Sequence, residues 1–289
     1  MNIAVLTIGY IFLAPLIGGL LDGIDRKISA RMQRRVGPPL LQPFYDVIKL
    51  LKKQVITVSS AQTFCLLSYL FLMVLTGTMF FAGWDILMCF FVMSTAATFL
   101  YFAAVVTSSA YATVGGNREL VQMMAYEPAV LLTCVGFYLA EGTFSVGTIA
   151  QSRLSNILFL PGFFVAFVFI LTIKMRKSPF ENSTSHHMQQ EQVKGLTTEM
   201  GAQNLALFQV AEWYENVFLM GVVGLFFVNE NPSSYIVAGV VILLVYFLEI
   251  LIDNSSARMK MDDMLRITWL VTLFTAGVNL LVLMLVKLF

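Results

Sequence analysis

The sequence has 289 residues, of which 58% are hydrophobic and only 12% are charged. Soluble domains carry roughly 25% charged and about 45–50% apolar residues, so this composition excludes a soluble enzyme and a disordered chain. The formal net charge of +1 provides no basic field for nucleic acid. The composition therefore predicts a single integral membrane domain over residues 1–289, with the lipid bilayer as its solvent.

Helices that cross a bilayer need about 20 mostly apolar residues. The apolar segments predict an all-α, polytopic membrane protein with about eight transmembrane helices and two long polar segments, at 22–62 and 174–204. The eight predicted spans are Ile3–Leu21, Thr63–Gly83, Ile86–Thr107, Leu120–Ala140, Asn156–Ile173, Leu205–Val228, Tyr235–Ile252 and Leu265–Phe289.

Lysine and arginine residues set the predicted orientation, because short cytoplasmic loops carry an excess of both. Arg153 and Lys287 are the exceptions. All other lysines and arginines lie in segment 22–62, which follows the first span, or in every second loop after that segment. This asymmetry places segments 22–62 and 174–204 in the cytoplasm and both termini outside it.

Part of the first cytoplasmic segment has the pattern of an amphipathic helix. Residues 40–54 read LLQPFYDVIKLLKKQ, with apolar residues at helical spacing and lysines, including Lys49, on the other face. Such a helix lies at a membrane surface as an anchor. It can equally be a platform on which a soluble partner docks, and the two interpretations are compatible.

Carboxylates inside predicted spans are the main functional signal, because a charge in hydrocarbon costs several kcal/mol. Glu127 and Glu212 each lie seven residues into spans that run outward, roughly 10 Å below the cytoplasmic boundary at 1.5 Å per residue. Glu215 follows one turn deeper, and Glu249 lies at the cytoplasmic end of its span. The pattern predicts a chain of proton-exchanging carboxylates; the alternative is structural pairing with boundary Arg or Lys residues.

The second cytoplasmic segment adds three acids, Glu181, Glu191 and Glu199, and the neighbouring histidines His186 and His187. Neighbouring histidines point in different directions on a regular backbone, so a joint metal site is not expected. Hydrogen bonding or pH sensitivity remains open for the histidines, as does a merely solvated loop.

The three cysteines are isolated from one another. Cys65, Cys89 and Cys134 lie in separate apolar runs, whereas zinc and iron–sulfur sites need clustered thiolates. We therefore expect small core residues and no metal or cofactor in this chain.

Several short motifs occur along the chain in a fixed order. They are Asp25–Arg26–Lys27, Arg35–Val36–Gly37–Pro38, Asp46–Val47–Ile48–Lys49, Ala125–Tyr126–Glu127, Ser178–Pro179–Phe180–Glu181, Glu191–Gln192–Val193–Lys194–Gly195, Thr198–Glu199–Met200–Gly201, Phe208 to Trp213 around Glu212, and Arg258–Met259–Lys260–Met261–Asp262.

With these motifs the sequence resembles the subunit 1 (H subunit) family of respiratory complex I and its hydrogenase relatives, over nearly the whole chain. Complex I proteins read P-E-A-E after the P-F-D motif, whereas this chain reads S-T-S-H-H at 183–187. That run, with G-P-P-L-L-Q-P-F-Y-D at 37–46, is most similar to the B subunit of energy-converting, Ech-type nickel–iron hydrogenases. Membrane subunits of carbon-monoxide-induced hydrogenase and formate hydrogenlyase are close relatives of that subunit.

The resemblance implies a non-catalytic subunit in the cytoplasmic membrane of a prokaryote, which couples ferredoxin-driven hydrogen chemistry to proton or sodium translocation. Implied partners are nickel–iron hydrogenase large and small subunits, an iron–sulfur ferredoxin-like subunit and an antiporter-like membrane subunit. The nickel–iron centre and iron–sulfur clusters would belong to those partners. The acids at 127, 181, 191, 199 and 212 match the family's proton-route acids. The implied interface and loop residues are Asp25, Arg26, Arg35, Asp46, Lys49, His186, His187, Arg258, Lys260 and Asp262.

Two other interpretations stay open. Within the family, the alternative is a quinone-binding H subunit of a complex I-type NADH dehydrogenase. Outside it, the chain could be a passive anchor or a free-standing ion carrier. An anchor does not need glutamates within the bilayer, and a carrier would be expected to show internal repeats, which are not visible here.

Overall fold

The structure, a computed structural model, describes residues 3–56, 59–183 and 194–288. Helices and turns make up this part of the chain, together with an isolated β-bridge between Asp85 and Ser145. The helices are α1 (Ile3–Met32), α2 (Gln42–Leu51), α3 (Ser60–Phe81), α4 (Ile86–Val105), α5 (Ala110–Glu141), α6 (Val146–Ile149), the 3-10 turn η1 (Asn156–Leu158), α7 (Pro161–Lys174), α8 (Ala202–Leu225), α9 (Ser233–Ser255), α10 (Met261–Thr272), the π-helical turn η2 (Leu273–Gly277) and α11 (Val278–Leu288).

The prediction of an all-α, polytopic membrane protein is confirmed. Each of the eight predicted spans falls on a helix, and six helices in the described part of the chain are long and apolar enough to cross a membrane. These six are α1, α3, α4, α5, α9 and the continuous α10–α11. Of the other two, α7 is apolar but has 14 residues, and α8 has 24 residues and carries Glu212 and Glu215.

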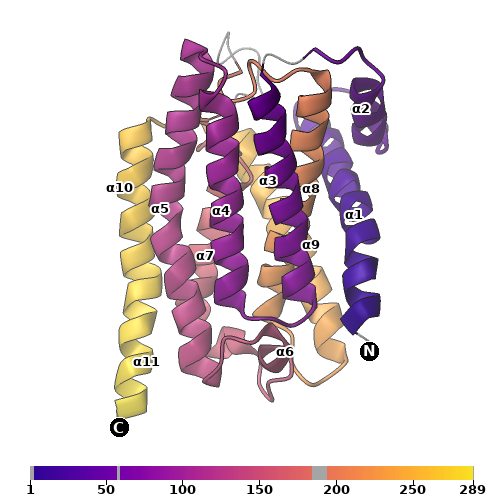
Figure 1. Ribbon diagram of the computed structural model, residues 1–289. Helices are drawn as coiled ribbons and strands as arrows, with labels where there is room; N and C mark the ends of the chain where they lie inside the picture. Colours follow the sequence, from indigo (N-terminus) through magenta and orange to yellow (C-terminus); the bar gives the residue numbers. More distant parts are fainter. Residues whose placement is uncertain (1–2, 57–58, 184–193, 289) are drawn as a thin grey trace.

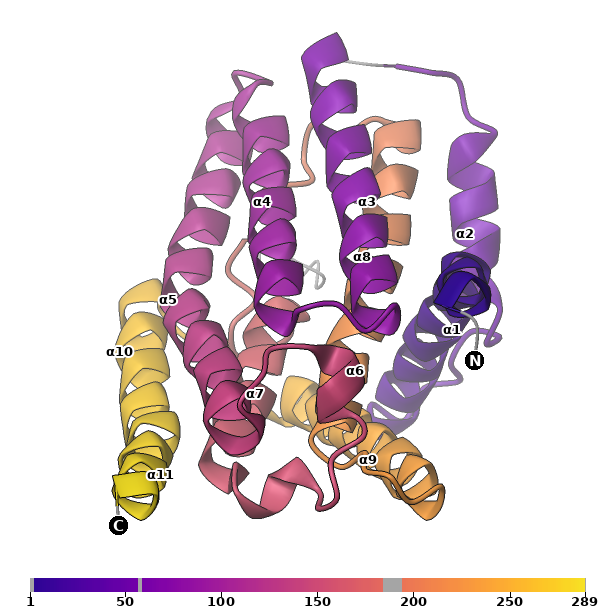
Figure 2. The ribbon, with the colours of Figure 1, turned by 60° about the horizontal axis from the view of Figure 1, so that its bottom comes forward.

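The long helices stand side by side as a bundle (Figure 1). α10 and α11 lie beside α5 at one edge, and α1 and α2 lie at the other. Both termini lie at the bottom end in this view, whereas α8 begins at the top end. Figure 2 shows α3, α4 and α8 in the middle, with α6 and its flanking turns closing the bottom end.

Local signals explain several helix boundaries. The Ser59 side chain accepts a hydrogen bond from the Ala61 N–H at the start of α3, and Pro161 opens α7. α5 ends at Gly142, whose φ of 75° is the left-handed conformation that glycine adopts without strain.

Two helices begin or end outside the predicted spans. α1 continues beyond Leu21 to Met32, and α5 begins at Ala110 rather than near Leu120. Both extensions are polar, and the predicted spans were defined as runs of mostly apolar residues, so the extensions fall outside them. Segment 22–62 is therefore partly helix, and the sequence-based depth of residues on α5 must be corrected.

The predicted amphipathic helix is confirmed as α2. Its buried residues are Pro43 and Val47, and Val47 packs in a cluster with Ala206 and Trp213 of α8. Tyr45, Ile48 and Leu51 on its other side are exposed. α2 is therefore held against the bundle by one face, beside α1 and α8.

Close packing of α1 on α8 sets the position of the acid-bearing segment of α8. A Cβ atom at Gly18 would lie 2.6 Å from the backbone oxygen of Trp213, closer than real Cβ atoms approach. Glycine at this position lets the two helices touch beside Glu212, and brings the acids of α1 and α8 to the same cavity.

Candidate functional site: a charged cavity at one end of the bundle

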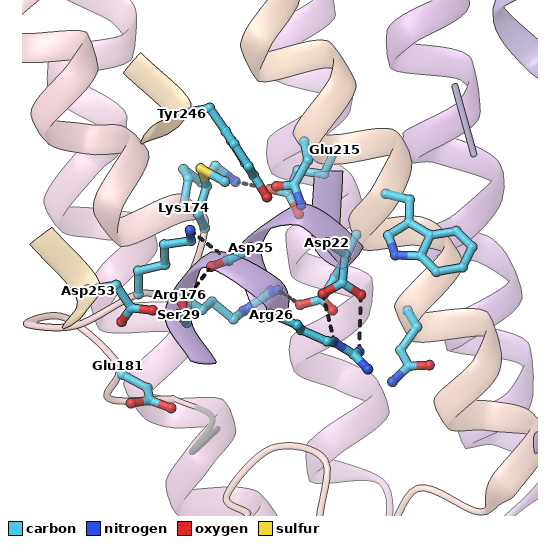
Figure 3. A pocket seen from close by; sticks show the side chains of 16 residues that line it. Asp22, Asp25, Arg26, Ser29, Lys174, Arg176, Glu181, Glu215, Tyr246 and Asp253 are labelled. Carbon is cyan, nitrogen blue, oxygen red and sulfur yellow. Dashed lines mark hydrogen bonds and ion pairs between the residues drawn. The ribbon is translucent and has the colours of Figure 1, made fainter. Parts of the chain in front are cut away.

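A cavity of about 410 Å³ lies between α1, the end of α7, α8 and α9. Figure 3 shows the side chains of these elements converging on it. Its charged lining residues are Asp22, Asp25, Arg26, Lys174, Arg176, Lys177, Glu181, Glu212, Glu215 and Asp253. Pockets for organic cofactors are mostly apolar with a few polar groups, so this lining suits water and exchangeable protons better than an apolar ligand.

The end of α7 supplies three cations within four residues. Lys174, Arg176 and Lys177 are 7%, 5% and 7% exposed, and each forms an ion pair with carboxylates of other helices. Arg176 has a φ of 50°, a left-handed conformation that is costly for a side chain with a Cβ atom. The same residue forms two ion pairs, with carboxylates of α5 and α8.

Arg176 connects α5 to α8. Its Nη2 lies 2.9 Å from Glu119 Oε1, and its Nη1 lies 2.6 Å from Glu212 Oε1. Burial lowers the pKa of Arg176, but Glu119 and Glu212 raise that pKa by more, so it lies above its ordinary value. The guanidinium is therefore a permanent positive charge shared by two carboxylates.

Lys174 and Glu215 form a second buried pair. The lysine Nζ lies 2.8 Å from Glu215 Oε1, and the Tyr69 hydroxyl donates a hydrogen bond of 3.1 Å to Glu215 Oε2. The ammonium group also lies 4.5 Å from the ring centroid of Tyr126. Both carboxylate oxygens of Glu215 therefore have a partner inside the protein.

The third set of pairs involves α1. Lys177 Nζ lies 2.8 Å from Asp25 Oδ2, and Arg26 pairs with Asp22 at 3.0 Å and with Asp46 of α2 at 2.7 Å. Ion pairs thus link charged groups of α1, α2, α5, α8 and the end of α7 around the cavity. Carboxylates in these pairs can exchange a proton whenever a paired cation moves away.

The structure brings together part of the predicted carboxylate chain. Glu181, Glu212 and Glu215 line the cavity, as do Asp25 and Arg26 from the predicted interface set. Glu249 is fully buried on α9, between Tyr246 and Asp253, which both line the cavity.

Glu127 does not join this cluster. It is half-buried on α5 and does not line the cavity. The α5 carboxylate at the level of Glu212 is Glu119, about two turns earlier in the helix, because Arg176 contacts both. The predicted common depth of Glu127 and Glu212 was wrong because α5 begins at Ala110, well before the apolar run.

The other described residues of the predicted loop and interface sets are not part of the cavity lining. Glu199 is half-buried and Lys49, Arg35, Lys260 and Asp262 are exposed. The Arg258 Nε donates to Asn182 Oδ1 at 3.3 Å. The residues His186, His187 and Glu191 lie outside the described residues.

Sequence reasoning missed the residues that hold the acids in place. Lys174, Arg176 and Lys177 contributed only to the predicted orientation, although three cations beside an apolar run are a signal for buried pairing. Glu119 follows two glycines and an arginine in G-G-N-R-E, where the apolar run is interrupted, so it lies outside the predicted span. Tyr69 has no local signal, because its partner Glu215 is distant in the sequence.

The three cysteines are buried and unpaired by disulfides, with exposures of 8% or less. Among the described residues, no group of three or more His, Cys, Asp or Glu side chains has the arrangement that a metal ion needs. Four carboxylates of the cavity, those of Asp22, Asp25, Glu212 and Glu215, are instead paired with lysine or arginine.

Comparisons with known proteins give the family. The model of the NADH dehydrogenase family matches residues 4–284. The chain is 26% identical to the H subunit of the NADH-quinone oxidoreductase of Rhodospirillum rubrum, over 90% of this chain and 86% of that protein. It is 27% identical to hydrogenase-4 component C of Escherichia coli, over 87% of each.

A solved structure has the same fold. A chain of the archaeal membrane-bound sulfane sulfur reductase, a respiratory membrane complex, matches with a TM-score of 0.86 and 20% identity, covering 98% of this chain and 100% of that one. The family match over nearly the whole length confirms the resemblance that the motifs indicated. This multi-pass membrane protein belongs to the NADH dehydrogenase family, the family that the motifs indicated as that of complex I subunit 1 and its hydrogenase relatives.

Proposed function

We propose that the chain is the membrane-anchoring, energy-coupling subunit of a multi-subunit energy-converting hydrogenase. It links ferredoxin-driven hydrogen chemistry in a soluble arm to translocation of protons or sodium ions. The observation that carries this proposal is the set of buried ion pairs around the cavity. Burying charged groups costs several kcal/mol per ion even when they are paired, and a passive anchor does not need them.

The end of α7 is where a soluble arm would act on these ion pairs. Lys174, Arg176 and Lys177 lead directly into the cytoplasmic segment that ends at 204, which faces the arm in this proposal. A shift of this segment alters the partners of carboxylates on α1, α5 and α8 together. A carboxylate that loses its cation takes up a proton, and it releases the proton when the cation returns.

The proposed route runs from the loop into the bundle and then to a partner. Protons enter at Glu181, Glu191 and Glu199 and pass by Glu212, Glu215 and Glu249. Glu127 is the exit toward an antiporter-like subunit, since a half-buried carboxyl on a membrane span requires cover by a partner.

The proposed assembly supplies the redox chemistry. Its members are nickel–iron hydrogenase large and small subunits, an iron–sulfur ferredoxin-like subunit and the antiporter-like subunit. The nickel–iron centre and the iron–sulfur clusters belong to those partners, and the complex lies in the cytoplasmic membrane of a prokaryote.

A quinone-reducing complex is the second candidate. The match to the H subunit of the NADH-quinone oxidoreductase of Rhodospirillum rubrum favours it. The charged lining of the cavity opposes it, because the hydrocarbon part of a quinone needs apolar walls. Quinone that co-purifies with the complex, or inhibition by rotenone-type compounds, would decide for this candidate.

Coupling is tested with Glu212→Gln and Glu127→Gln in the intact complex. Glu119 still neutralises Arg176 when Glu212 is replaced, so we expect assembly and hydrogen production with artificial electron donors to persist. Ion uptake by inside-out vesicles should fall to the level seen with an uncoupler, because glutamine keeps the shape but cannot exchange a proton. The matched control is Glu230→Gln, an exposed acid in the turn between α8 and α9. Wild-type ion uptake in both variants would show that these acids are structural.

The proposed orientation places both termini outside the cytoplasm, and single cysteines test it. Both termini lie at the same end as the turn between α8 and α9 (Figure 1). Glu230→Cys should react with a membrane-impermeant thiol reagent only from outside the cell, and Lys53→Cys only from the cytoplasmic side. Background labelling should be low, because the three native cysteines are buried. The reverse pattern would overturn the orientation.

A further inference from the structure

Glu249 has an environment that no other carboxyl of the cavity region shares among the described residues. It is 0% exposed, and neither of its carboxyl oxygens has a hydrogen-bond partner there. An isolated buried carboxylate is strongly disfavoured, whereas a neutral carboxylic acid is tolerated. The charge of Glu249 therefore depends on whether a cation reaches it.

Lys177 is the cation within reach. Tyr246 and Asp253 are the neighbours of Glu249 one turn before and one turn after it on the same face of α9. The Lys177 ammonium lies 5.0 Å from the ring centroid of Tyr246, and the next residue, Ser178, donates its N–H to Asp253 Oδ1 at 2.8 Å. Lys177 is thus held beside α9 on both sides of Glu249, and it acts electrostatically on that carboxyl.

Asp25 of α1 holds Lys177 in the present arrangement, but loosely. The two charged atoms are 2.8 Å apart, yet the Nζ makes no well-directed hydrogen bond. Asp25 also accepts a hydrogen bond from Ser29 Oγ at 3.1 Å, and its side chain is 21% exposed and lines the cavity. Without the lysine, Asp25 therefore keeps a hydrogen-bond donor and its place in the cavity lining, whereas the oxygens of Glu249 have no hydrogen-bond partner among the described residues.

The other charged groups around this part of α9 do not replace Lys177. Asp22 and Asp25 of α1 act on Tyr246, and Asp253 acts on Glu249 from the same helix, and all three are acids. Glu215 of α8 also lines the cavity, but its oxygens are bound by Lys174 and Tyr69. Figure 3 shows Asp25, Tyr246 and Asp253 among the side chains that line the cavity.

We propose that Lys177 moves between Asp25 and Glu249, so that Glu249 stores a proton that the position of one lysine controls. When Lys177 pairs with Asp25, Glu249 is a neutral acid. When Lys177 turns to Glu249, the O–H bond breaks, the proton passes to water in the cavity, and a carboxylate–ammonium pair remains. The return of the lysine to Asp25 draws a proton from the same water. This inference deepens the proposed function and rests on it for its role in coupling.

Infrared spectroscopy of the purified complex at neutral pH tests the lysine movement without measuring transport. The band of a protonated carboxylic acid that disappears in Glu249→Gln reports the neutral form of Glu249. Asp25→Asn should send Lys177 to Glu249. The ratio of protonated to ionised Glu249 should then fall by about 10- to 1000-fold, the usual effect of an opposite charge in contact. The double variant Asp25→Asn/Lys177→Gln should regain the band.

Three controls separate this mechanism from general damage. Asp25→Glu keeps the ion pair and should keep the band. Lys53→Gln, which removes an exposed lysine, should not restore the band in the Asp25→Asn background. If Asp25→Asn fails to assemble, Asp25→Ser removes the same charge. An unchanged band in the charge-removing variant, or no recovery in the double variant, would overturn the proposal. Glu212→Gln should leave the band in place. Normal ion uptake in Glu212→Gln would therefore contradict the proposed function, whereas an unchanged band after removal of the Asp25 charge would contradict the lysine movement.

Discussion

Replacing Arg176 by Met should lower the free energy of unfolding by about 3–5 kcal/mol, the usual cost of removing one partner from a buried ion pair. The Arg176 side chain is 6% exposed, and its two carboxylates belong to Glu119 and Glu212, with side-chain exposures of 11% and 23%. Without the guanidinium these acids face each other in the protein interior and must be protonated. The expected readouts are a shifted denaturant transition of the subunit in mixed micelles and a reduced amount of assembled complex.

Arg26→Met is the matched control for that variant. Arg26 also pairs with two carboxylates, those of Asp22 and Asp46, but its side chain is 36% exposed and theirs are 29% and 33% exposed. Ion pairs at this exposure contribute roughly 0–1 kcal/mol, so the control should change stability little. Equal losses in the two variants would contradict the view that burial of the Arg176 pairs makes them structurally important.

Hydrophobicity was enough to predict most of the fold, because each helix that crosses the bilayer needs about 20 mostly apolar residues. The helix predicted at Ile86–Thr107 is observed at Ile86–Val105, and that predicted at Thr63–Gly83 at Ser60–Phe81. The amphipathic pattern of α2 was visible for the same reason, since its apolar residues repeat at helical spacing.

The start of α5 could not be predicted in this way. Its first three turns contain Gly115 and Gly116, which lower helix propensity, and Arg118 and Glu119, which break the apolar run. Tertiary packing overrides both effects. A Cβ atom at Gly115 would lie 2.3 Å from the backbone nitrogen of Leu196, so glycine permits a contact with a segment far along the chain. This contact made Glu119, rather than Glu127, the α5 acid of the site.

The partners of the acids were also beyond local sequence reasoning. Arg176 pairs with residues on α5 and α8 that lie 57 positions before it and 36 after it. Nothing in the spacing of the residues indicates which cation meets which acid. The family resemblance pointed to Glu212 and Glu181, which line the cavity, but the pairing of each acid with a lysine or arginine at the end of α7 is seen only in three dimensions.

Lys174→Met should produce a loss of stability similar to that of Arg176→Met, about 3–5 kcal/mol. Among the described residues, it leaves Glu215, whose side chain is 4% exposed, with the Tyr69 hydroxyl as its one hydrogen-bond partner. The double variant Lys174→Met/Glu215→Gln should recover all but about 1 kcal/mol, because a buried ion pair contributes little net stability compared with uncharged groups of similar size. Denaturant titration of the two variants beside the wild type measures both values.

The double variant also separates the two roles that Glu215 can have. Once denaturant titration shows that its stability is recovered, a fall in ion uptake by vesicles can no longer be attributed to misfolding. We expect ion uptake to fall, since the substitution removes a proton-exchanging group between Glu212 and the end of α7, while hydrogen production with artificial donors continues. Full ion uptake by this stable variant would remove Glu215 from the proton route and leave it as the structural partner of Lys174 alone.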